Sequence, residues 1–533
     1  MIQLPEWITI LPPILAILLA FITKEVVSSL LSGLLLGVMI VQYQKDQWFG
    51  VLQSPFVLID TYLPQSVVPN PENGQVDRGH ISILIFSVMI GGVSMLIQKN
   101  GGMSALVHKL SHFANNKKKT QMLTYLMGIL IFFDDYANTL IVGNTTRGLA
   151  RKFKISKEKM AYLVDSTAAP IAALAFATTW IGAELTYISD STKGLVDLEK
   201  SAYALFLSSI PYSFYAILTL VFIPLIVIKN IDFGPMKRAE DAAQITESTD
   251  SYADKQVNEN GPIGLALLPL SILSIGTLIG LLVSGYSENV WQNSELSLTL
   301  KLSRTIGESN SYHALLWSSF VASVVGVLSS LWYKKLSLKQ SIESLFLGYK
   351  SMIEAVIILI LAWSLSGVLD DLGTASFLEE IISGHVPPNW LPSVVFVLAI
   401  LVSFSTGSSW GTMAILFPLI LSTAWQLYTN ANLVNQAESL FSLTIACIMS
   451  GAVFGDHISP ISDTTIMSSM STGCNHIEHV RTQMPYAILI GLVALFAGIV
   501  PVSFGLNVWF ALILCLLVLL IIVFALSKMQ KEV

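Results

Sequence analysis

Acidic side chains interrupt apolar stretches of this chain that are long enough to lie in a membrane. The run from Gly128 to Phe133 leads into Asp134-Asp135-Tyr136-Ala137-Asn138-Thr139. The next apolar stretch contains Asp165-Ser166-Thr167-Ala168-Ala169-Pro170. An ionisable group at membrane depth costs several kcal/mol by most estimates, so such groups usually mark the path of an ion or a substrate.

The second half of the chain repeats this arrangement. The run from Ala399 to Phe404 leads into Ser405-Thr406-Gly407-Ser408-Ser409, and a later apolar stretch holds the segment 455–464, Gly-Asp-His-Ile-Ser-Pro-Ile-Ser-Asp-Thr. Phe133 and Phe404, which precede the polar groups, are separated by 271 residues, as are Gly102 and Gly373, which open two amphipathic segments. Such weak internal symmetry is typical of transporters built from repeats.

The polar groups offer carboxylate, hydroxyl and amide oxygens, which are hard ligands suited to Na⁺. Burial and a neighbouring like charge both make a carboxylate harder to ionise, so clustered carboxylates would take up protons or Na⁺, but less readily both together. That competition is sufficient for exchange. The candidate ion- and proton-binding residues are Asp134, Asp135, Asn138, Thr139, Asp165, Ser166, Thr167, Ser405, Thr406, Ser408, Ser409, Asp456, His457, Asp463 and Thr464. The candidate Na⁺ ligands among them are Asp134, Asp135, Asp165, Asp456 and Asp463.

A binding site at membrane depth also needs broken helices, and the sequence supplies helix breakers. Gly407 and Gly411 give flexibility, and Pro170 and Pro460 each remove a helical hydrogen bond. Freed carbonyls and half-helix ends can then bind an ion.

Structural roles remain open for the same residues. Asp134-Asp135 could form a cytoplasmic turn, Asp165 could lie at the membrane interface, and His457 could orient a neighbour instead of relaying protons. Glu354 and Glu184 are expected at the interface. The Ser and Thr hydroxyls could simply bond to helix carbonyls, which is common in membrane helices. The segment Gly407-Ser408-Ser409-Trp410-Gly411 matches the elbow of serine hydrolases, but that elbow requires a strand-to-helix turn that these apolar flanks do not allow.

Composition supports a membrane protein. The chain has 533 residues, 53% hydrophobic and only 12% charged, and its mean hydropathy is +0.67. Average globular chains carry about twice that charged fraction. Cys447, Cys474 and Cys515 lie far apart and suggest neither disulfides nor a zinc site. The basic residues flank apolar segments, so a nucleic-acid partner is not expected. The first apolar run, Ile8 to Ile22, lacks a basic start and is expected to be a retained helix.

Charge asymmetry predicts the topology. Lys117-Lys118-Lys119 precede the stretch 120–146, and a second basic cluster over 147–159 follows it, so both flanks favour the cytoplasm. A re-entrant hairpin with Asp134–Thr139 at its tip satisfies both. The stretch 392–427 lies in a region, 351–480, that has no Lys or Arg, so its flanks fit the outside. The two hairpins would then enter from opposite faces, as in an inverted repeat.

The predicted fold is therefore an all-α polytopic membrane protein with inverted-topology repeats, about 11 spanning helices, two re-entrant hairpins and two broken helices. The expected spans are 8–22, 26–42, 80–98, 158–182, 203–228, 262–284, 312–333, 351–369, 438–472, 484–504 and 507–527. Residues 101–114 and 373–383 are expected to be amphipathic surface segments. The expected units are a first repeat, 1–228, a cytoplasmic linker, 229–260, a second repeat, 261–505, and an extra C-terminal helix and tail, 506–533.

Several of these stretches together resemble the NhaC-type Na⁺/H⁺ antiporter family. They are the segment 132–138 around Asp134-Asp135, the segment 165–170, and above all Gly455-Asp456-His457 through Ser462-Asp463-Thr464. The resemblance implies Na⁺/H⁺ exchange across a bacterial inner membrane, with Na⁺, Li⁺ and H⁺ as cargo. The resemblance does not fix the substrate, because similar proteins exchange organic acids or carry amino acids.

The sequence therefore favours a secondary active antiporter that exchanges cytoplasmic Na⁺ for external H⁺ by alternating access. The main alternative is a Na⁺- or H⁺-coupled transporter or exchanger of an organic acid or amino acid, with Trp410 lining the site. A channel is a second alternative, and it would show no coupled proton flux. No enzymatic activity and no cofactor are expected. The C-terminus is predicted inside and the N-terminus outside. The apolar segments 26–42, 203–228 and 507–527 are scaffold candidates that could support a homodimer.

Overall fold

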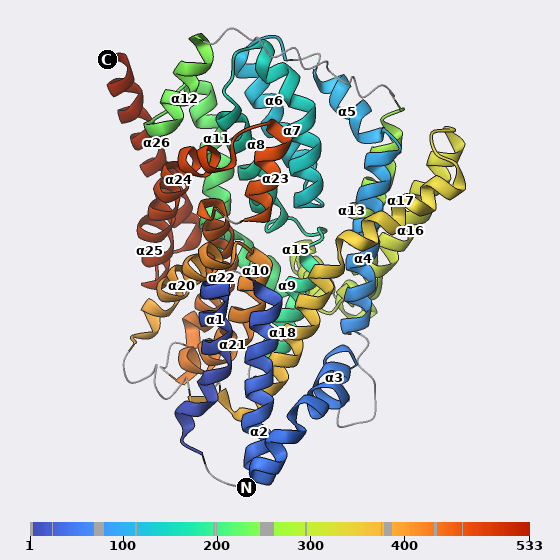
Figure 1. Ribbon diagram of the computed structural model, residues 1–533, viewed down its shortest axis with the longest axis vertical. Helices are drawn as coiled ribbons and strands as arrows, with labels where there is room; N and C mark the ends of the chain where they lie inside the picture. The colour runs from blue at the N-terminus through green and yellow to red at the C-terminus, as the bar shows by residue number, and fades with distance from the viewer. Residues whose placement is uncertain are drawn as a thin grey trace.

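A computed structural model describes residues 4–23, 25–68, 79–111, 114–193, 195, 198, 200–245, 261–293, 296–374, 376–377, 386–430, 434–460 and 462–532. These residues form helices and no strand (Figure 1). Ten helices are long and apolar enough to cross a membrane, or eleven when the pair α10 (Ala202–Ser209) and α11 (Phe214–Lys229), bent by 47°, is taken with its 3-10 turn as one span. The prediction of an all-helical membrane protein with about eleven spans is confirmed.

The first re-entrant hairpin consists of α6 (Lys117–Leu130) and α7 (Asp135–Lys152). The Asn116 side chain caps the start of α6, and the Asp134 carboxylate accepts from the N–H of Ala137, 2.6 Å away, at the start of α7. These two caps satisfy N–H groups that a helix start leaves unpaired, so the chain can break and reverse between them. Both helices lie in the upper half of the molecule in Figure 1.

The second re-entrant hairpin consists of α20 (Leu391–Thr406) and α21 (Ser409–Asn430), in the lower half of Figure 1. Gly407 ends α20 with φ of 64°, a left-handed conformation that glycine adopts without a Cβ penalty. Ser408 then accepts from the N–H of Gly411 at 3.2 Å and starts α21. The two hairpins therefore occupy opposite ends of the molecule, as the inverted-repeat prediction requires.

Two broken helices follow the hairpins. The first is α8 (Lys157–Ala172) and α9 (Ile181–Thr192), and the second is α22 (Val434–Ile458) and α23 (Asp463–Thr472). Pro460 lies in the second break, as expected. Asp165 and Pro170, however, lie inside α8, and the first break comes only after Ala172. The helix continues past Pro170 because the proline removes one hydrogen bond only, and the N–H of Ala173 again reaches the carbonyl of Ala169 at 3.0 Å.

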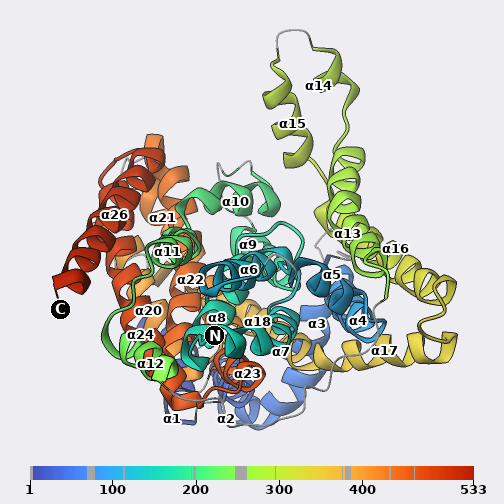
Figure 2. The same ribbon diagram turned by 90° about the horizontal axis from the view of Figure 1, so that it is seen from above.

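A second group of helices packs beside the hairpin-bearing bundle. It comprises α4 (Gly79–Lys99), α13 (Gly264–Ser284), α16 (Ser311–Trp332) and α17 (Leu338–Ser351), which contact one another. Figure 2 shows α13 and α16 at one side of the molecule, with α14 (Glu288–Gln292) and α15 (Leu298–Gly307) projecting away. The helix α18 (Ile353–Leu372) follows α17 and contacts α2 (Val26–Val57), α4, α9 and α21, so it joins the two groups.

The remaining helices surround these two groups. They are α1 (Leu11–Thr23), α3 (Leu63–Val67), α5 (Gly102–Ser111), α12 (Gly234–Ile245), α24 (His476–Val493), α25 (Val500–Ser503) and α26 (Val508–Glu532). The helix α5 packs against both α4 and α13 of the second group and α6 and α7 of the first hairpin. It covers most of the predicted amphipathic segment 101–114, whereas most of its counterpart, 373–383, lies outside the described residues. The described termini lie at opposite ends of the long axis (Figure 1). Which end faces the cytoplasm stays a prediction, as do the repeat boundaries and the homodimer.

One predicted span differs from the structure, and part of the predicted linker is helical. The expected span 8–22 is a 3-10 turn followed by α1, which is shorter than a spanning helix. The first part of the expected linker 229–260 is ordered as α12, which packs against α8 and α24. Glu240 of α12 pairs with Lys117, and Asp232 pairs with the buried Lys159 at 2.5 Å. These ion pairs attach the segment to the bundle, and residues 246–260 lie outside the described part.

The contact between α20 and α22 gives a direct test of the packing. A Cβ at Gly455 would lie 2.5 Å from the carbonyl oxygen of Ile400 and 2.6 Å from Cβ of Ser403. We expect Gly455→Ala to push the helices apart and to destabilise the protein by about 1–3 kcal/mol. A Cβ at Gly367 would meet nothing within 4 Å, so Gly367→Ala is the matched control and leaves stability unchanged or slightly higher. Thermal unfolding in detergent measures both, and equal melting temperatures would contradict this packing.

Candidate ion-binding site

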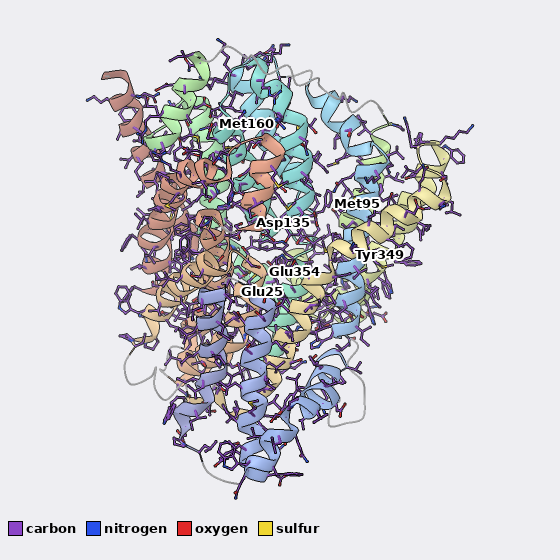
Figure 3. All side chains as sticks on the ribbon, viewed as in Figure 1. Glu25, Met95, Asp135, Met160, Tyr349 and Glu354 are labelled. Atoms are coloured by element: carbon purple, nitrogen blue, oxygen red, sulfur yellow. The ribbon has the colours of Figure 1, made fainter. Side chains whose placement is uncertain are left out.

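A small cavity lies where both hairpin turns, both helix breaks and the α17–α18 junction meet. Its volume is about 40 Å³. Its lining is formed by Asp135, Tyr136, Thr179, Ser351, Met352, Glu354, Ala355, Ile358, Ser408, Trp410 and Asp463. Figure 3 shows Asp135 and Glu354 near the middle of the long axis. Three of these side chains are carboxylates, and none of the described residues that line the cavity is Lys, Arg or His.

Each carboxylate of the cavity stands in the first turn of a helix. Asp135 begins α7, Asp463 begins α23 and Glu354 lies near the start of α18. The N-terminus of a helix carries partial positive charge, which stabilises a carboxylate there. The Tyr136 hydroxyl donates to Asp463, and the N–H of Thr464 donates to the same carboxylate at 2.8 Å. The cavity is therefore acidic, and the helix ends that face it hold the acidic groups in place.

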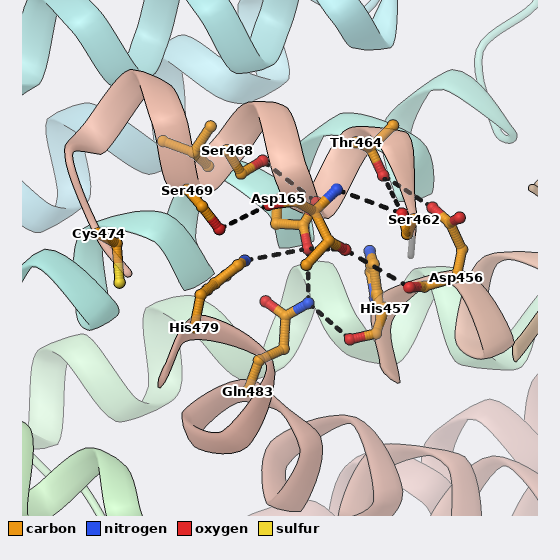
Figure 4. A network of polar contacts seen from close by, with 12 residues as sticks. Asp165, Asp456, His457, Ser462, Thr464, Ser468, Ser469, Cys474, His479 and Gln483 are labelled. Carbon is orange, nitrogen blue, oxygen red and sulfur yellow. Dashed lines mark hydrogen bonds and ion pairs between the residues drawn. The ribbon is translucent and has the colours of Figure 1, made fainter. Parts of the chain in front are cut away.

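A second, fully buried polar network lies behind the cavity (Figure 4). Its centre is Asp165 of α8, which four side chains contact: Thr465 at 3.0 Å, Ser468 at 3.2 Å, His479 at 3.3 Å and Gln483 at 2.6 Å. Hydrogen bonds to the ionised form favour a carboxylate, so this environment suits a permanent negative charge. Asp165 therefore joins α8 to α23 and α24, and its donors compete with any cation for its oxygens.

Asp456 is less fully satisfied than Asp165. One of its oxygens accepts from the Thr464 hydroxyl at 2.8 Å, and the other is buried without a hydrogen-bond partner among the described atoms. The Ser462 hydroxyl lies 3.1 Å from that of Thr464, and the Thr465 hydroxyl lies 3.5 Å from the carbonyl of Asp456. This group of oxygens lies on both sides of the α22–α23 break, and Thr464 connects it to Asp463 at the cavity.

The five candidate aspartates do not meet at one point. Within the described residues no three His, Cys, Asp or Glu side chains lie close enough to hold a metal ion together. Asp135 and Asp463 line the cavity, whereas Asp165 and Asp456 belong to the buried network and are linked through Thr465. The arrangement offers two neighbouring sites, each with few carboxylates.

Other predicted ligands have structural roles in this conformation. The Asn138 amide donates to the carbonyls of Gly128, Ile131 and Thr167 at 2.7, 3.2 and 3.1 Å, which closes the end of α6 and attaches it to α8. His457 contacts the Tyr215 hydroxyl at 2.9 Å through Nδ1, so it is held in one orientation. Several hydroxyls bond to nearby backbone carbonyls, namely those of Thr139, Thr167, Ser405, Thr406 and Ser409. Ser166 is buried in α8.

Sequence reasoning missed several residues of the site. They are Tyr136, Thr179, Ser351, Thr465, Ser468, His479 and Gln483. His479 and Gln483 are four residues apart and so share one helix face, but they lie in the polar first half of α24, ahead of its apolar part and of the predicted span 484–504. The sequence predicts Glu354 and Glu184 at the membrane interface, and of the two only Glu184 is closed off from the surface. Glu354 lines the cavity, and Glu184 is fully buried in α9.

The fold and the acidic cavity together define a membrane transporter and not an enzyme. The chain belongs to the Na⁺/H⁺ antiporter family, whose model matches residues 172–500. An uncharacterised protein of Haemophilus influenzae is 28% identical over 521 residues, which cover 98% of this chain and 95% of that protein.

Other similarities are more local or more distant. The malate-2H⁺/Na⁺-lactate antiporter of Bacillus subtilis is 27% identical over 175 residues, 33% of this chain and 34% of its own length. The arginine/ornithine antiporter of Halobacterium salinarum is 28% identical over 141 residues, 26% of this chain and 27% of its own. The crystal structure of the Alcanivorax borkumensis YdaH transporter superposes with a TM-score of 0.57 at 12% identity, over 86% of this chain and 90% of that one. That likeness concerns the fold.

Asp165 and Asp134 should respond differently to the same substitution. In Asp165→Asn an amide N–H₂ would face hydrogen-bond donors and the charge would be lost, so we expect destabilisation by about 3 kcal/mol. Asn caps a helix as well as Asp does, so Asp134→Asn is the matched control and keeps the melting temperature near that of the wild type. Thermal unfolding of the purified proteins measures this, and equal stabilities would mean that Asp165 does not join the helices.

Proposed function

We propose that this member of the family is a secondary active Na⁺/H⁺ antiporter that exchanges cytoplasmic Na⁺ for external H⁺ by alternating access. The observation that carries this proposal is the acidic cavity, in which Asp135, Asp463 and Glu354 face a space lined by no basic side chain. A negatively charged cavity attracts cations and repels anions.

Competition between H⁺ and Na⁺ follows from the placement of these carboxylates. Asp135 directly follows Asp134 in the chain and lines the same small cavity as Asp463, so their like charges act on it. Like charges this close in a poorly hydrated site disfavour full ionisation, so the group takes up either protons or a cation. Binding of Na⁺ would release protons, and protonation would release Na⁺. Thr464 gives the ion a short route from Asp463 to the oxygens around Asp456.

The size of the cavity also favours an inorganic cation. Sites for small organic ligands commonly measure about 300–1,000 Å³. The cavity here measures about 40 Å³ in this conformation, enough for an ion with little of its water. In this conformation an ion held there would contact at most two of the three carboxylates, which come from α7, from α23 and, across the cavity, from α18.

Alternating access would arise at the boundary between the two helix groups. The cavity lies between the hairpin-bearing bundle and the α17–α18 junction, so a movement of the bundle against α4, α13, α16 and α17 would open it to either face. This mechanism rests on analogy with other transporters of broken-helix architecture. The basic ends of α6 and α7 would face the cytoplasm of a bacterial inner membrane, in line with the positive-inside rule.

An organic solute is the second candidate. Two local relatives are named for exchange of malate with lactate and of arginine with ornithine. Trp410 and Tyr136 give the cavity two aromatic walls, which could contact a carbon skeleton after the cavity opens. The acidic lining would suit a cationic solute better than a carboxylate, unless Na⁺ binds with the carboxylate.

Purified protein in vesicles with an acidic lumen and an internal pH dye tests both candidates. We expect Na⁺ or Li⁺, added without any organic solute, to make the lumen more alkaline, and K⁺ to have little effect. Asp135→Asn and Asp463→Asn should each lower the initial rate about ten-fold or more, because each removes a charge that faces the cavity. Asp241→Asn, on the exposed side of α12, is the control and should match the wild type.

No response to Na⁺ or Li⁺ by correctly inserted protein would contradict Na⁺/H⁺ exchange. A screen of amino acids and carboxylates would then identify a solute, and a response in that screen would establish the second candidate. Wild-type rates in both cavity variants would instead show that the ion binds elsewhere.

A further inference from the structure

Glu184 of α9 is a buried carboxylic acid that the cavity mechanism does not use. The residue is 0% exposed, and neither carboxylate oxygen has a hydrogen-bond partner among the described atoms. An ionised carboxylate without a partner is very costly in an apolar interior, and such a group in practice becomes neutral. Glu184 therefore holds either a proton or a cation whenever its surroundings are closed as they are here.

The contacts of α9 place Glu184 along the second hairpin. Trp180 lies against Trp410 of α21, with ring centroids 5.9 Å apart, and Tyr187 stacks on Phe417 at 5.8 Å. Further along, the Ser422 hydroxyl donates to the carbonyl of Ser191 at 3.1 Å. Successive residues of α9 contact successive residues of α21 in the same order, so the two helices run side by side in the same direction. Glu184 shares the helix face of Trp180 and Tyr187 and so lies between the two aromatic pairs.

Further buried polar atoms on α9, or just before it, also lack hydrogen-bond partners in the described structure. They are Oγ1 of Thr179, Nε1 of Trp180, the hydroxyl of Tyr187 and Oγ of Ser191. Trp180, Glu184, Tyr187 and Ser191 follow one another at spacings of four, three and four residues and, with Thr179 before the helix, form the α9 polar stripe. One end of the stripe reaches the cavity, because Thr179 and Trp410 line it. The other end lies near the C-terminus of α9.

Charged groups on the helices packed against α9 have other partners or lie at its ends. These helices are α4, α10, α18 and α21. His80 of α4 pairs with Asp190 at 2.9 Å, and Asp190 also pairs with Lys193. On α18, Glu354 lies at the cavity, and Asp371 accepts from Tyr62 at the opposite end, beside Asp370.

The tyrosines of α10 and α21 are engaged as well. Tyr203 donates to the carbonyl of Phe176 at 3.2 Å, and Tyr428 contacts the Thr444 hydroxyl at 2.7 Å. No basic side chain of the described packed helices hydrogen-bonds to Glu184. Trp180 and Tyr187, one helical turn before and after Glu184, are the nearest polar side chains of the stripe, and their N–H and O–H groups can bond to water but cannot balance a charge.

We propose that Glu184 is the proton-carrying carboxylate of the transport cycle and that the α9 polar stripe is the proton route between the cavity and the face where α9 ends. This proposal deepens the Na⁺/H⁺ exchange proposed above and rests on it. When the stripe hydrates, a hydronium ion transfers its proton to the Glu184 carboxylate and becomes water. On the way inward the O–H bond of Glu184 breaks, and the proton passes through Thr179 or water to an ionised Asp135 as Na⁺ leaves.

Replacing Glu184 by its neutral isostere separates proton movement from cation movement. We expect Glu184→Gln to lower Na⁺-driven proton flux about ten-fold or more, because the variant cannot bind and release a proton. Exchange of labelled Na⁺ for unlabelled Na⁺ across the same vesicles, which needs no net proton movement, should remain within about two-fold of the wild-type rate. Glu343→Gln, at an exposed position on α17, is the matched control.

Glu184→Asp keeps the carboxyl group and should restore part of the proton flux, with a displaced pH profile. If the glutamine variant does not fold, the proton flux and pH profile of Glu184→Asp test the proposal in its place. Wild-type proton flux in Glu184→Gln would overturn the proposal. Loss of labelled Na⁺ exchange as well, in a variant of unchanged melting temperature, would also overturn it, because Glu184 would then be a cation ligand.

Infrared difference spectra between high and low pH provide a readout that does not depend on the transported solute. The wild type should show the carbonyl stretch of a protonated carboxylic acid that appears with falling pH, and Glu184→Gln should lack that component. A spectrum identical in both proteins would overturn the proton-carrying role even if Na⁺/H⁺ exchange is confirmed. If the vesicles respond only to an organic solute, this spectrum still decides the role of Glu184 separately.

Discussion

The fold depends on how it places carboxylates in an apolar interior, where an unpartnered charge is very costly. Asp165 receives four side-chain contacts, and Asp232 pairs with the buried Lys159. Asp456 keeps one oxygen without a partner, and Glu184 has none for either oxygen. Carboxylates with several partners join helices, whereas carboxylates with an unpartnered oxygen are free to exchange an ion or a proton.

Broken helices make it possible to place both kinds of carboxylate at mid-depth. A continuous spanning helix satisfies its own backbone and presents no helix ends at mid-depth. Here the turn of the first hairpin, the α22–α23 break and the α17–α18 junction each bring a helix N-terminus with an acidic residue to one cavity, and the turn of the second hairpin adds Ser408. The same breaks leave short half-helices, and these are held by specific contacts: the Asn138 amide on three carbonyls, and Asp165 between α8, α23 and α24. Support and site are therefore built from the same polar residues.

The surroundings of the cavity also indicate which parts move together. Glu240 pairs with Lys117 at the base of α6, and Asp232 pairs with Lys159 at the base of α8. The segment that follows α11 is thus fastened to the first hairpin and the first broken helix. By contrast, Ser351 and Glu354 reach the cavity from α17 and α18. A boundary at the cavity between two such groups is what alternating access requires.

The sequence by itself determined the helical membrane fold, the two re-entrant hairpins and the two acidic regions, because apolar length, basic flanks and interrupting carboxylates are local properties of the chain. It also showed Asp135, Asp456 and Asp463 as acidic residues within polar interruptions of apolar stretches. Tertiary structure alone decided their partners. Thr465, Ser468, His479 and Gln483 reach Asp165 from 300 or more residues away. Whether Glu184 meets lipid headgroups or a closed interior depends on how α9 packs against α21. The sequence of α9 alone does not indicate that contact.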